Sequence, residues 1–294
     1  MRIGIIGGTG LGEALRKELP SSDFKAHDIN TPFGKTSAPL LTGKIAGTEV
    51  ALLQRHGEGH VFNPAAVPYR ANIFALKTLG VTHILAGGAV GSLREDIHPG
   101  ELVICDQLID LTRNRRNTFY ENAAVHVEFA EPFCPVMRGW LRDAGAEINN
   151  MVHGEGTYVC MEGPAFSTRA ESRMHRQLGG DLIGMTACPE AKLAREAEIA
   201  YAMVALVTDY DCWREKHTTG NNQELLSEII ANMHHATRSA INLFKQALQN
   251  INVLQMTPSP AANALQLALW TDRNAVPDEE KQRLQPLWGR YFEN

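Results

Sequence analysis

The segment over residues 184–213 constrains the fold more than any other part of the chain. It reads as a short turn, a helix that begins at Pro189, and an apolar strand over residues 202–207. Asp209 and Asp211 follow that strand directly. Because open α/β sheets bind their ligands at the carboxyl ends of strands, these two carboxylates are candidate ligand groups. A solvated aspartate turn that ends a strand is the structural alternative.

The length and composition fit one large α/β domain around that strand. The 294 residues are 44% apolar, which is enough to bury a full core. A formal net charge of -5 with interspersed signs argues against nucleic acid as the main partner. We expect no membrane association, since no apolar run approaches the roughly 18 residues of a membrane helix. The first residues enter a strand and a glycine loop without a leader pattern, so we expect a cytoplasmic protein.

The five cysteines are widely separated, and none belongs to a CxxC pair. They are Cys105, Cys134, Cys160, Cys188 and Cys212. This distribution is typical of thiols in a reducing compartment. It argues against a zinc site and against a cysteine nucleophile.

Small residues follow two of the predicted strands. The strand over residues 2–6 leads into GGTGLG at 7–12, where exposed backbone N–H groups and the Thr9 hydroxyl can hold an anion. A strand over residues 83–85 is predicted to end in a small-residue loop over 86–92. Both loops then lie at the same edge of the sheet.

An arginine and a histidine follow another short strand. Residues 50–53 run into Arg55 and His56, which places a cation and an imidazole near the glycine turns. The convergence of these strand ends predicts a pocket of phosphate size. A surface salt bridge is the structural alternative for Arg55. Dinucleotide binding is an alternative for the first glycine turn, but the required spacing fails at Glu13.

The remaining elements complete an α/β pattern with an aromatic tail. Strands are predicted over 102–104 and 157–160, and helices over 69–79, 223–251, 265–270 and 278–284. Thr168 and Glu171 form a capping box that begins a further helix. Phe166 and Met161 precede that cap; such residues are usually core, but at a sheet end they can also flank a planar ring. The tail over 255–294 is expected to be a helical extension packed on the domain or on a neighbouring subunit.

Eight motifs occur in order along residues 3–250. They are GGTGLG, RHGEGH, PYRANIFALKTLG, AVGSLREDIHPGELVICDQLIDLT, AEPFCP, CMEGPAFSTRAES, GMTACPEAKLAREAEIAYA and VTDYDCW. Together they resemble the methylthioadenosine phosphorylase family of the purine nucleoside phosphorylase superfamily. The resemblance implies one α/β domain over 1–254 with a mixed, partly barrelled sheet surrounded by helices. It also implies a homotrimer that converts 5'-methylthioadenosine and inorganic phosphate to adenine and 5-methylthioribose 1-phosphate, without a metal or organic cofactor.

The resemblance assigns residues to three parts of a site. The phosphate contacts are Thr9, Arg55, His56, Ala89 and Thr186; the purine and ribose contacts are Phe166, Ser167, Met185, Asp209 and Asp211; the methylthio pocket contains Leu225, Leu226 and His126, the last from a neighbouring subunit. Asp209, kept protonated by desolvation, can then give a proton to the leaving purine at N7. Asp211 can accept a hydrogen bond from the exocyclic amine of the purine.

Two glycines depart from the family pattern, and four other activities stay open. Gly88 stands where many relatives have Thr or Ser, so a hydroxyl contact to phosphate is absent, and Gly184 replaces a bulkier Asn. A 6-oxopurine nucleoside or methylthioinosine phosphorylase shares the fold but is expected to carry Asn at position 209. The second alternative is a nucleosidase, which uses water and needs no anion site. The third is a dehydrogenase, which needs a nicotinamide cofactor. The fourth is a module that binds purines without catalysing a reaction.

Overall fold

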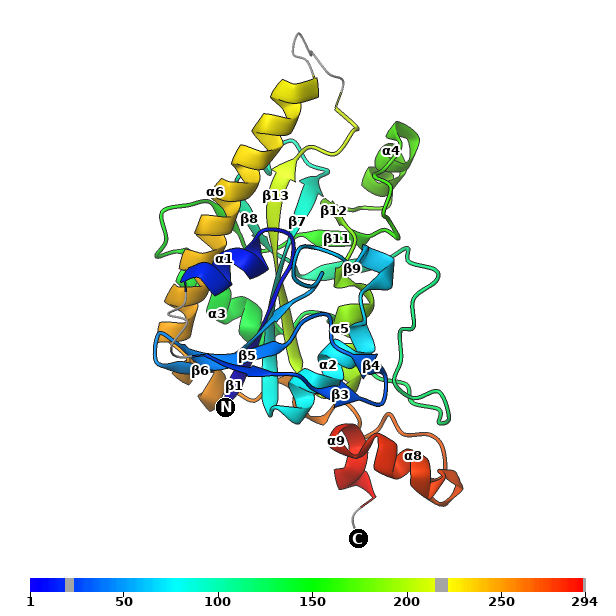
Figure 1. Ribbon diagram of the computed structural model, residues 1–294. Helices are drawn as coiled ribbons and strands as arrows, with labels where there is room; N and C mark the ends of the chain where they lie inside the picture. The colour runs from blue at the N-terminus through cyan, green and yellow to red at the C-terminus, as the bar shows by residue number, and fades with distance from the viewer. Residues whose placement is uncertain (19–23, 215–221, 293–294) are drawn as a thin grey trace.

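The computed structural model describes residues 1–18, 24–214 and 222–292, apart from the side chains of Glu18, Asn222 and Leu225. Its centre is one mixed β-sheet (Figure 1). The strands of this sheet are β1 (Arg2–Gly7), β2 (Lys25–His27), β5 (Leu40–Ile45), β6 (Thr48–Gln54), β7 (Val81–Ser92), β8 (Leu102–Ile104), β9 (Gln107–Asp110), β10 (Val152–His153), β11 (Thr157–Cys160), β12 (Leu182–Gly184) and β13 (Ala200–Asp209). A separate small hairpin contains β3 (Asn30–Thr31) and β4 (Gly34–Lys35).

Strand β7 is the centre of the sheet. The order β10-β8-β13-β7-β1-β6-β5-β2 runs along the main path, and β12, β11 and β9 form a branch that joins β7 near its end. Strands β1 and β13 both run parallel to β7, whereas β12 is antiparallel to it. The carboxyl ends of β1, β7 and β13 therefore lie close together, as the sequence predicted.

The prediction of a loop over residues 86–92 is wrong, because this run continues β7 as regular strand. Glycine is usually unfavourable within a strand unless another group approaches the backbone closely. That condition holds here. A Cβ on Gly87 would lie 2.3 Å from Leu11, and one on Gly91 would lie 3.0 Å from Ile183. The small residues let neighbouring elements pack directly on the strand backbone.

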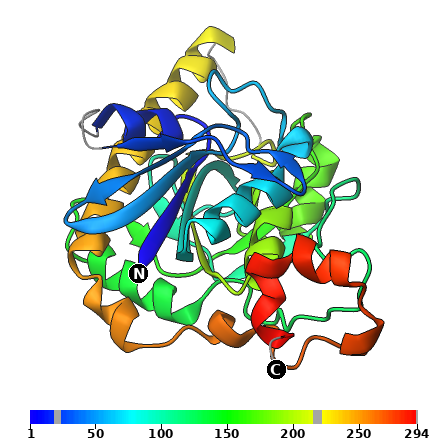
Figure 2. The same ribbon diagram turned by 60° about the horizontal axis from the view of Figure 1, so that its bottom comes forward.

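Helices cover the sheet on both faces (Figures 1 and 2). They are α1 (Leu11–Glu18), α2 (Tyr69–Thr78), α3 (Pro135–Gly145), α4 (Arg169–Gln177), α5 (Ala187–Glu196), α6 (Asn222–Gln249), α7 (Asn252–Met256), α8 (Asp278–Arg283) and α9 (Gln285–Trp288). Residues of β13 alternate between two cores: Met203 packs with α2 and α5, and Val204 packs with α1, α3 and α6. Burial on both faces explains the continuous apolar run of this strand.

Most predicted elements are confirmed, with shifted ends. Helix α2 ends before Gly80, whose φ of 75° is suited to glycine, and the Thr168 capping box begins α4. Regular helical backbone in α5 starts after Cys188, as expected for a helix beginning at Pro189. Helices α1, α3, α7 and α9 were not predicted. The helix predicted over 265–270 is wrong, because these residues form turns and a bridge between Leu269 and Val125.

The C-terminal segment packs against the domain beside the start of the sheet (Figure 2). Trp288 is fully buried, and its ring lies 4.8 Å from that of Tyr120. Leu284 and Leu287 belong to the same core as α2 and α5. In Figure 1, α8 and α9 lie at the bottom of the molecule, opposite the upper ends of β7 and β13. Among the described helices, none combines the length and apolar character needed to cross a membrane.

Candidate active site

A cavity of about 380 Å³ opens where the central strands end. Its walls come from the turns after β1, β6 and β12, from the last residues of β7 and β13, from residues 161–166, and from α6. The lining residues used below are Thr9, Arg55, His56, Gly88, Ala89, Met161, Phe166, Met185, Thr186, Asp209, Asp211, Ile229 and Met233. The structure thus brings together most of the residues that the sequence selected as candidates.

The backbone of β7 is open toward this cavity. Strand β1 pairs with β7 only as far as Gly87, and β12 begins to pair with it at Gly91. Residues 88–90 therefore lack a strand neighbour on that edge, although β13 pairs with their other edge. Unpaired peptide groups beside the Thr9 and Thr186 hydroxyls can hold an oxyanion.

Arg55 is fully buried, and its charge is already paired. Its Nε and Nη2 donate to the two carboxylate oxygens of Glu190 at 2.7 and 2.8 Å, and Nη1 donates to the Gly87 carbonyl at 2.9 Å. Burial opposes the charged guanidinium, yet Glu190 holds the pKa of Arg55 above its ordinary value. These three bonds use three of the five donor hydrogens of the guanidinium. Tyr201 donates to Glu190 from the other side.

His56 is neutral, with one ring nitrogen directed to the backbone. Its Nδ1 lies 2.8 Å from the Phe62 carbonyl, so Nδ1 carries the proton and Nε2 keeps its lone pair. Burial, assisted by the Arg55 charge, lowers the pKa of His56 to about 4. The ring stacks on His60 with centroids 4.3 Å apart. In this state His56 can accept a hydrogen from a protonated phosphate oxygen.

Asp209 and Asp211 are held by a bulge and a tight turn at the end of β13. The pairing with β7 shifts register at Thr208, which redirects the residue that follows. Asp209 accepts hydrogen bonds from the Thr208 hydroxyl and the Asp211 amide, both at 2.7 Å. Burial nevertheless raises the pKa of Asp209. Asp211 has a φ of 51°, and its buried Oδ2 has no hydrogen-bond partner.

Arg115 fixes the wall that carries Met185, a role that sequence reasoning missed. Its Nη1 donates to the carbonyls of Met185 and Cys188, both at 2.6 Å, and its Nη2 donates to the Glu162 carbonyl at 2.6 Å. One buried guanidinium thus joins residues 161–162 to residues 185–188. The sequence shows Arg115 only as part of a basic cluster.

Gly88 and Gly184, the two departures from the family pattern, differ in the space available for a side chain. A Cβ at Gly184 would lie 2.0 Å from the hydroxyl of Tyr158, and that hydroxyl accepts a hydrogen bond from the Thr186 amide. Any larger residue at 184 would therefore displace the tyrosine. A Cβ at Gly88 would meet only Met203 closely, at 3.2 Å, with the Thr186 hydroxyl at 3.7 Å. A side chain at 88 would extend toward the anion-binding groups.

Three predicted residues whose side chains the structure describes, Ser167, Leu226 and His126, do not line the cavity of this chain. Ser167 lies beside it, where its hydroxyl contacts the Met161 sulfur at 3.7 Å. Leu226 is exposed, and α6 instead presents Ile229 and Met233 to the cavity. His126 is exposed on another part of the surface, edge-on to Trp270. The Leu225 side chain is outside the described part of the structure.

Glu190 is the main functional candidate that the sequence interpretation did not select. It lies in α5 between a proline and an alanine, within a run of buried residues. A buried carboxylate requires a cation or a hydrogen-bond donor as its partner. A glutamate within an otherwise apolar run was therefore the sequence signal that could have identified Glu190. The partner, Arg55, is 135 residues away in sequence. Within the described residues, no group of three or more His, Cys, Asp or Glu side chains is arranged to hold a metal ion.

Comparison with known proteins supports one family. The model of the Phosphorylase superfamily matches residues 2–249. S-methyl-5'-thioadenosine phosphorylase of Geobacter sulfurreducens is 46% identical over 291 residues, which cover 98% of each chain. The crystal structure of a methylthioadenosine phosphorylase from an Antarctic soil metagenomic library has a TM-score of 0.85 at 44% identity, covering 97% of this chain and 98% of that one.

A more distant solved structure has the same fold. Methylthioadenosine phosphorylase from Schistosoma mansoni, in complex with adenine, has a TM-score of 0.80 at 34% identity, covering 92% of this chain and 99% of that one. The mixed sheet surrounded by helices is therefore the architecture that the sequence predicted. On the match of the family model and of these full-length relatives, the chain belongs to the phosphorylase superfamily.

Proposed function

We propose that this enzyme cleaves S-methyl-5'-thioadenosine with inorganic phosphate, releasing adenine and 5-methylthioribose 1-phosphate. The observation that carries the proposal is one cavity with two chemically different ends. Thr9, Thr186 and the open backbone of β7 offer hydrogen-bond donors at one end, and Asp209 and Asp211 offer carboxyl groups at the other. Relatives with this name over almost the full chain support it.

The donor end suits a phosphate that acts as the nucleophile. A phosphate oxygen forms a bond to C1' of the ribose while the bond from C1' to N9 breaks, and the electron pair of that bond moves into the purine. Holding the phosphate in place supplies most of the entropic advantage of such a reaction. The Thr9 and Thr186 hydroxyls, Arg55 and His56 are the groups that would hold it.

The carboxyl end suits the leaving group. The purine gains negative charge as the bond to N9 breaks, and a proton placed at N7 neutralises that charge. Asp209, whose pKa is raised by burial, would give this proton. Asp211, with an unpartnered buried Oδ2, would accept a hydrogen bond from the 6-amino group. Phe166 and Met161 lie in the same cavity and would flank the ring.

The proposed reaction is tested by turnover of S-methyl-5'-thioadenosine with and without phosphate. We expect adenine and 5-methylthioribose 1-phosphate in equal amounts when phosphate is present, and no adenine release without it. Chromatographic quantification of both products is the measurement. Adenine release at an unchanged rate without phosphate would identify a nucleosidase. Binding without turnover would leave only a purine-binding module.

We also propose a homotrimer in the cytoplasm, with His126 of one subunit completing the methylthio pocket of the next. Apolar side chains are exposed near the cavity and beside His126. Phe166 is 85% exposed, Leu226 is 58% exposed, and Trp270, whose ring contacts that of His126, is 72% exposed. Exposed apolar side chains of this size often mark an interface. The five unpaired cysteines suit a reducing compartment.

Light scattering during size-exclusion chromatography tests this assembly. We expect a mass of about three chains, since a closed ring of identical contacts is the ordinary outcome of such an interface. His126→Ala should then raise the KM for S-methyl-5'-thioadenosine while leaving the KM for phosphate unchanged. A fully active monomer would remove the reason for giving His126 a role.

A further inference from the structure

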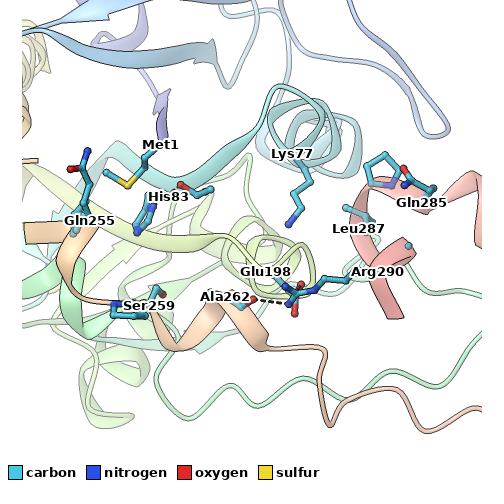
Figure 3. A pocket seen from close by; sticks show the side chains of 15 residues that line it. Met1, Lys77, His83, Glu198, Gln255, Ser259, Ala262, Gln285, Leu287 and Arg290 are labelled. Carbon is cyan, nitrogen blue, oxygen red and sulfur yellow. Dashed lines mark hydrogen bonds and ion pairs between the residues drawn. The ribbon is translucent and has the colours of Figure 1, made fainter. Parts of the chain in front are cut away.

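A second cavity, of about 680 Å³, lies at the opposite end of the sheet from the candidate active site (Figure 3). It is formed where the starts of β1 and β7 meet the end of α2 and the C-terminal segment. The ionisable groups of its lining are the side chains of Lys77, His83, Glu198 and Arg290 and the amino group of Met1, whose charge acts on His83. None of these belongs to the cavity at the strand ends.

Glu198 and Arg290 compensate each other. Arg290 Nη2 lies 2.7 Å from the Glu198 carboxylate, which also accepts hydrogen bonds from the Tyr291 hydroxyl at 2.6 Å and the Leu265 amide at 3.0 Å. Arg290 further donates to the Ala262 carbonyl. This pair contributes no net charge to the cavity.

Lys77 is the side-chain cation of the lining that has no carboxylate of its own. Its ammonium is directed toward the Glu198 and Arg290 pair in Figure 3, and it donates a hydrogen bond to the Ala197 carbonyl at 2.5 Å. Burial lowers the pKa of Lys77, as expected for an ammonium without a carboxylate of its own. An ammonium has further hydrogens to donate. A ligand with a negative group would supply the missing partner.

His83 adds a polar group without a partner. It is 8% exposed, and its Nδ1 lies 2.9 Å from the Thr82 hydroxyl, whereas its Nε2 has no hydrogen-bond partner. Burial lowers its pKa to about 4, so the ring is neutral near pH 7 and adds no charge. An unpaired buried polar atom is unfavourable unless a ligand or water contacts it. The ring lies in the part of the cavity near Gln255 in Figure 3.

The remaining walls are largely apolar. The apolar lining residues are Met1, Leu254, Pro258, Ala262, Pro286 and Leu287, and the uncharged polar ones are Thr82, Gln255, Ser259 and Gln285. Leu254 and Leu287 are themselves buried and belong to the two cores, so these walls are fixed by packing. A mainly apolar cavity with a few polar groups is the usual form of a small-molecule site.

We propose that this cavity binds a small organic anion, whose carboxylate or phosphate group pairs with Lys77 and whose apolar body lies against Leu254, Pro258 and Leu287. The proposal does not depend on the activity assigned to the other cavity. An acid group of the ligand would pair with the Lys77 ammonium, and the Met1 amino group adds positive charge to the same lining. The His83 ring belongs to the lining of the same cavity.

The His83 ring is a local reporter for binding in this cavity. Long-range proton–nitrogen NMR spectra of the histidine rings, with the His83 signals assigned from His83→Gln, would be followed during addition of benzoate, phenyl phosphate or benzamide. The first two compounds carry an acid group on an apolar ring, and benzamide is a neutral compound of similar shape. We expect saturable shifts of the His83 signals with at least one acid and none with benzamide. Comparison of the two acids identifies whether carboxylate or phosphate is preferred.

Variants of Lys77 test the charge directly. Lys77→Met keeps the aliphatic stem, and we expect it to weaken binding of the preferred acid about tenfold or more. Lys77→Arg should retain binding, and Lys25→Met, an exposed lysine of β2, is the matched control that should change nothing. Equal shifts with benzamide, no His83 shift with either acid, or undiminished binding by Lys77→Met would overturn the proposal. The wild-type comparison of acid and amide decides the matter even if Lys77→Met does not fold.

Discussion

Asp209→Asn is expected to lower kcat/KM for S-methyl-5'-thioadenosine by about 10²- to 10⁴-fold, the usual contribution of a general acid. Asparagine keeps the size of the side chain and can still accept from the Asp211 amide, but it has no acidic proton for N7. Its amide can donate to the O6 of a 6-oxopurine. The ratio of activities on methylthioinosine and S-methyl-5'-thioadenosine should therefore rise. Steady-state kinetics on both substrates measure this ratio.

The pH dependence of the activity is a second test of Asp209 as the proton donor to the purine. Because burial raises the pKa of Asp209, its proton is retained to a higher pH than on an exposed aspartate. Activity should fall as the pH rises through that pKa, and this alkaline limb should be absent from Asp209→Asn. Asp278→Asn, at an exposed residue of α8, is the control. A variant with unchanged selectivity and an unchanged pH profile would show that Asp209 does not act on the base.

Arg55→Met is expected to destabilise the protein by about 3–5 kcal/mol, because it leaves the buried Glu190 carboxylate without its cation. It should also lower kcat/KM for phosphate by roughly 10- to 100-fold, since a hydrogen bond to a charged group contributes about 1.5–3 kcal/mol. Urea unfolding and steady-state kinetics measure the two effects. Both effects follow from one guanidinium, so a single variant does not separate them.

The double variant Arg55→Met with Glu190→Gln separates stability from function. It removes both buried charges and keeps an acceptor for the Tyr201 hydroxyl, so it should recover at least about 2 kcal/mol of the lost stability. The defect in phosphate use should remain, because Arg55 is still absent. Recovery of normal phosphate kinetics together with stability would mean that Arg55 serves only the fold.

The sequence predicted the elements whose signals are local. The apolar run before Asp209 and the alternation of strands with helices each depend on a few consecutive residues. The resemblance of the motifs assigned residues such as Thr9, Thr186 and Met185 to one site, and the structure places these residues around one cavity. Strand ends of a parallel sheet meet at one edge, so this convergence follows from the order of elements along the chain.

The small-residue run over 86–92 shows why local signals failed elsewhere. Its glycines resemble a loop in sequence, but β1, β12 and β13 pair with that segment and hold it as a strand. Pairing energy from distant segments outweighs the weak strand preference of glycine. The open edge at residues 88–90, which forms the donor end of the cavity, is a product of where β1 and β12 stop.

By itself, the sequence determined the order of the main strands and helices, namely β1, β6, α2, β7, β8, β11, α4, α5, β13 and α6, and the position of two aspartates directly after β13. Only the tertiary structure decided that Arg55 is buried against Glu190, that Arg115 joins two walls of the cavity, and that a second cavity surrounds Lys77. The physical reason is that the partner of a buried charge is selected by proximity after folding. Glu190 is 135 residues from Arg55, and no local pattern connects them.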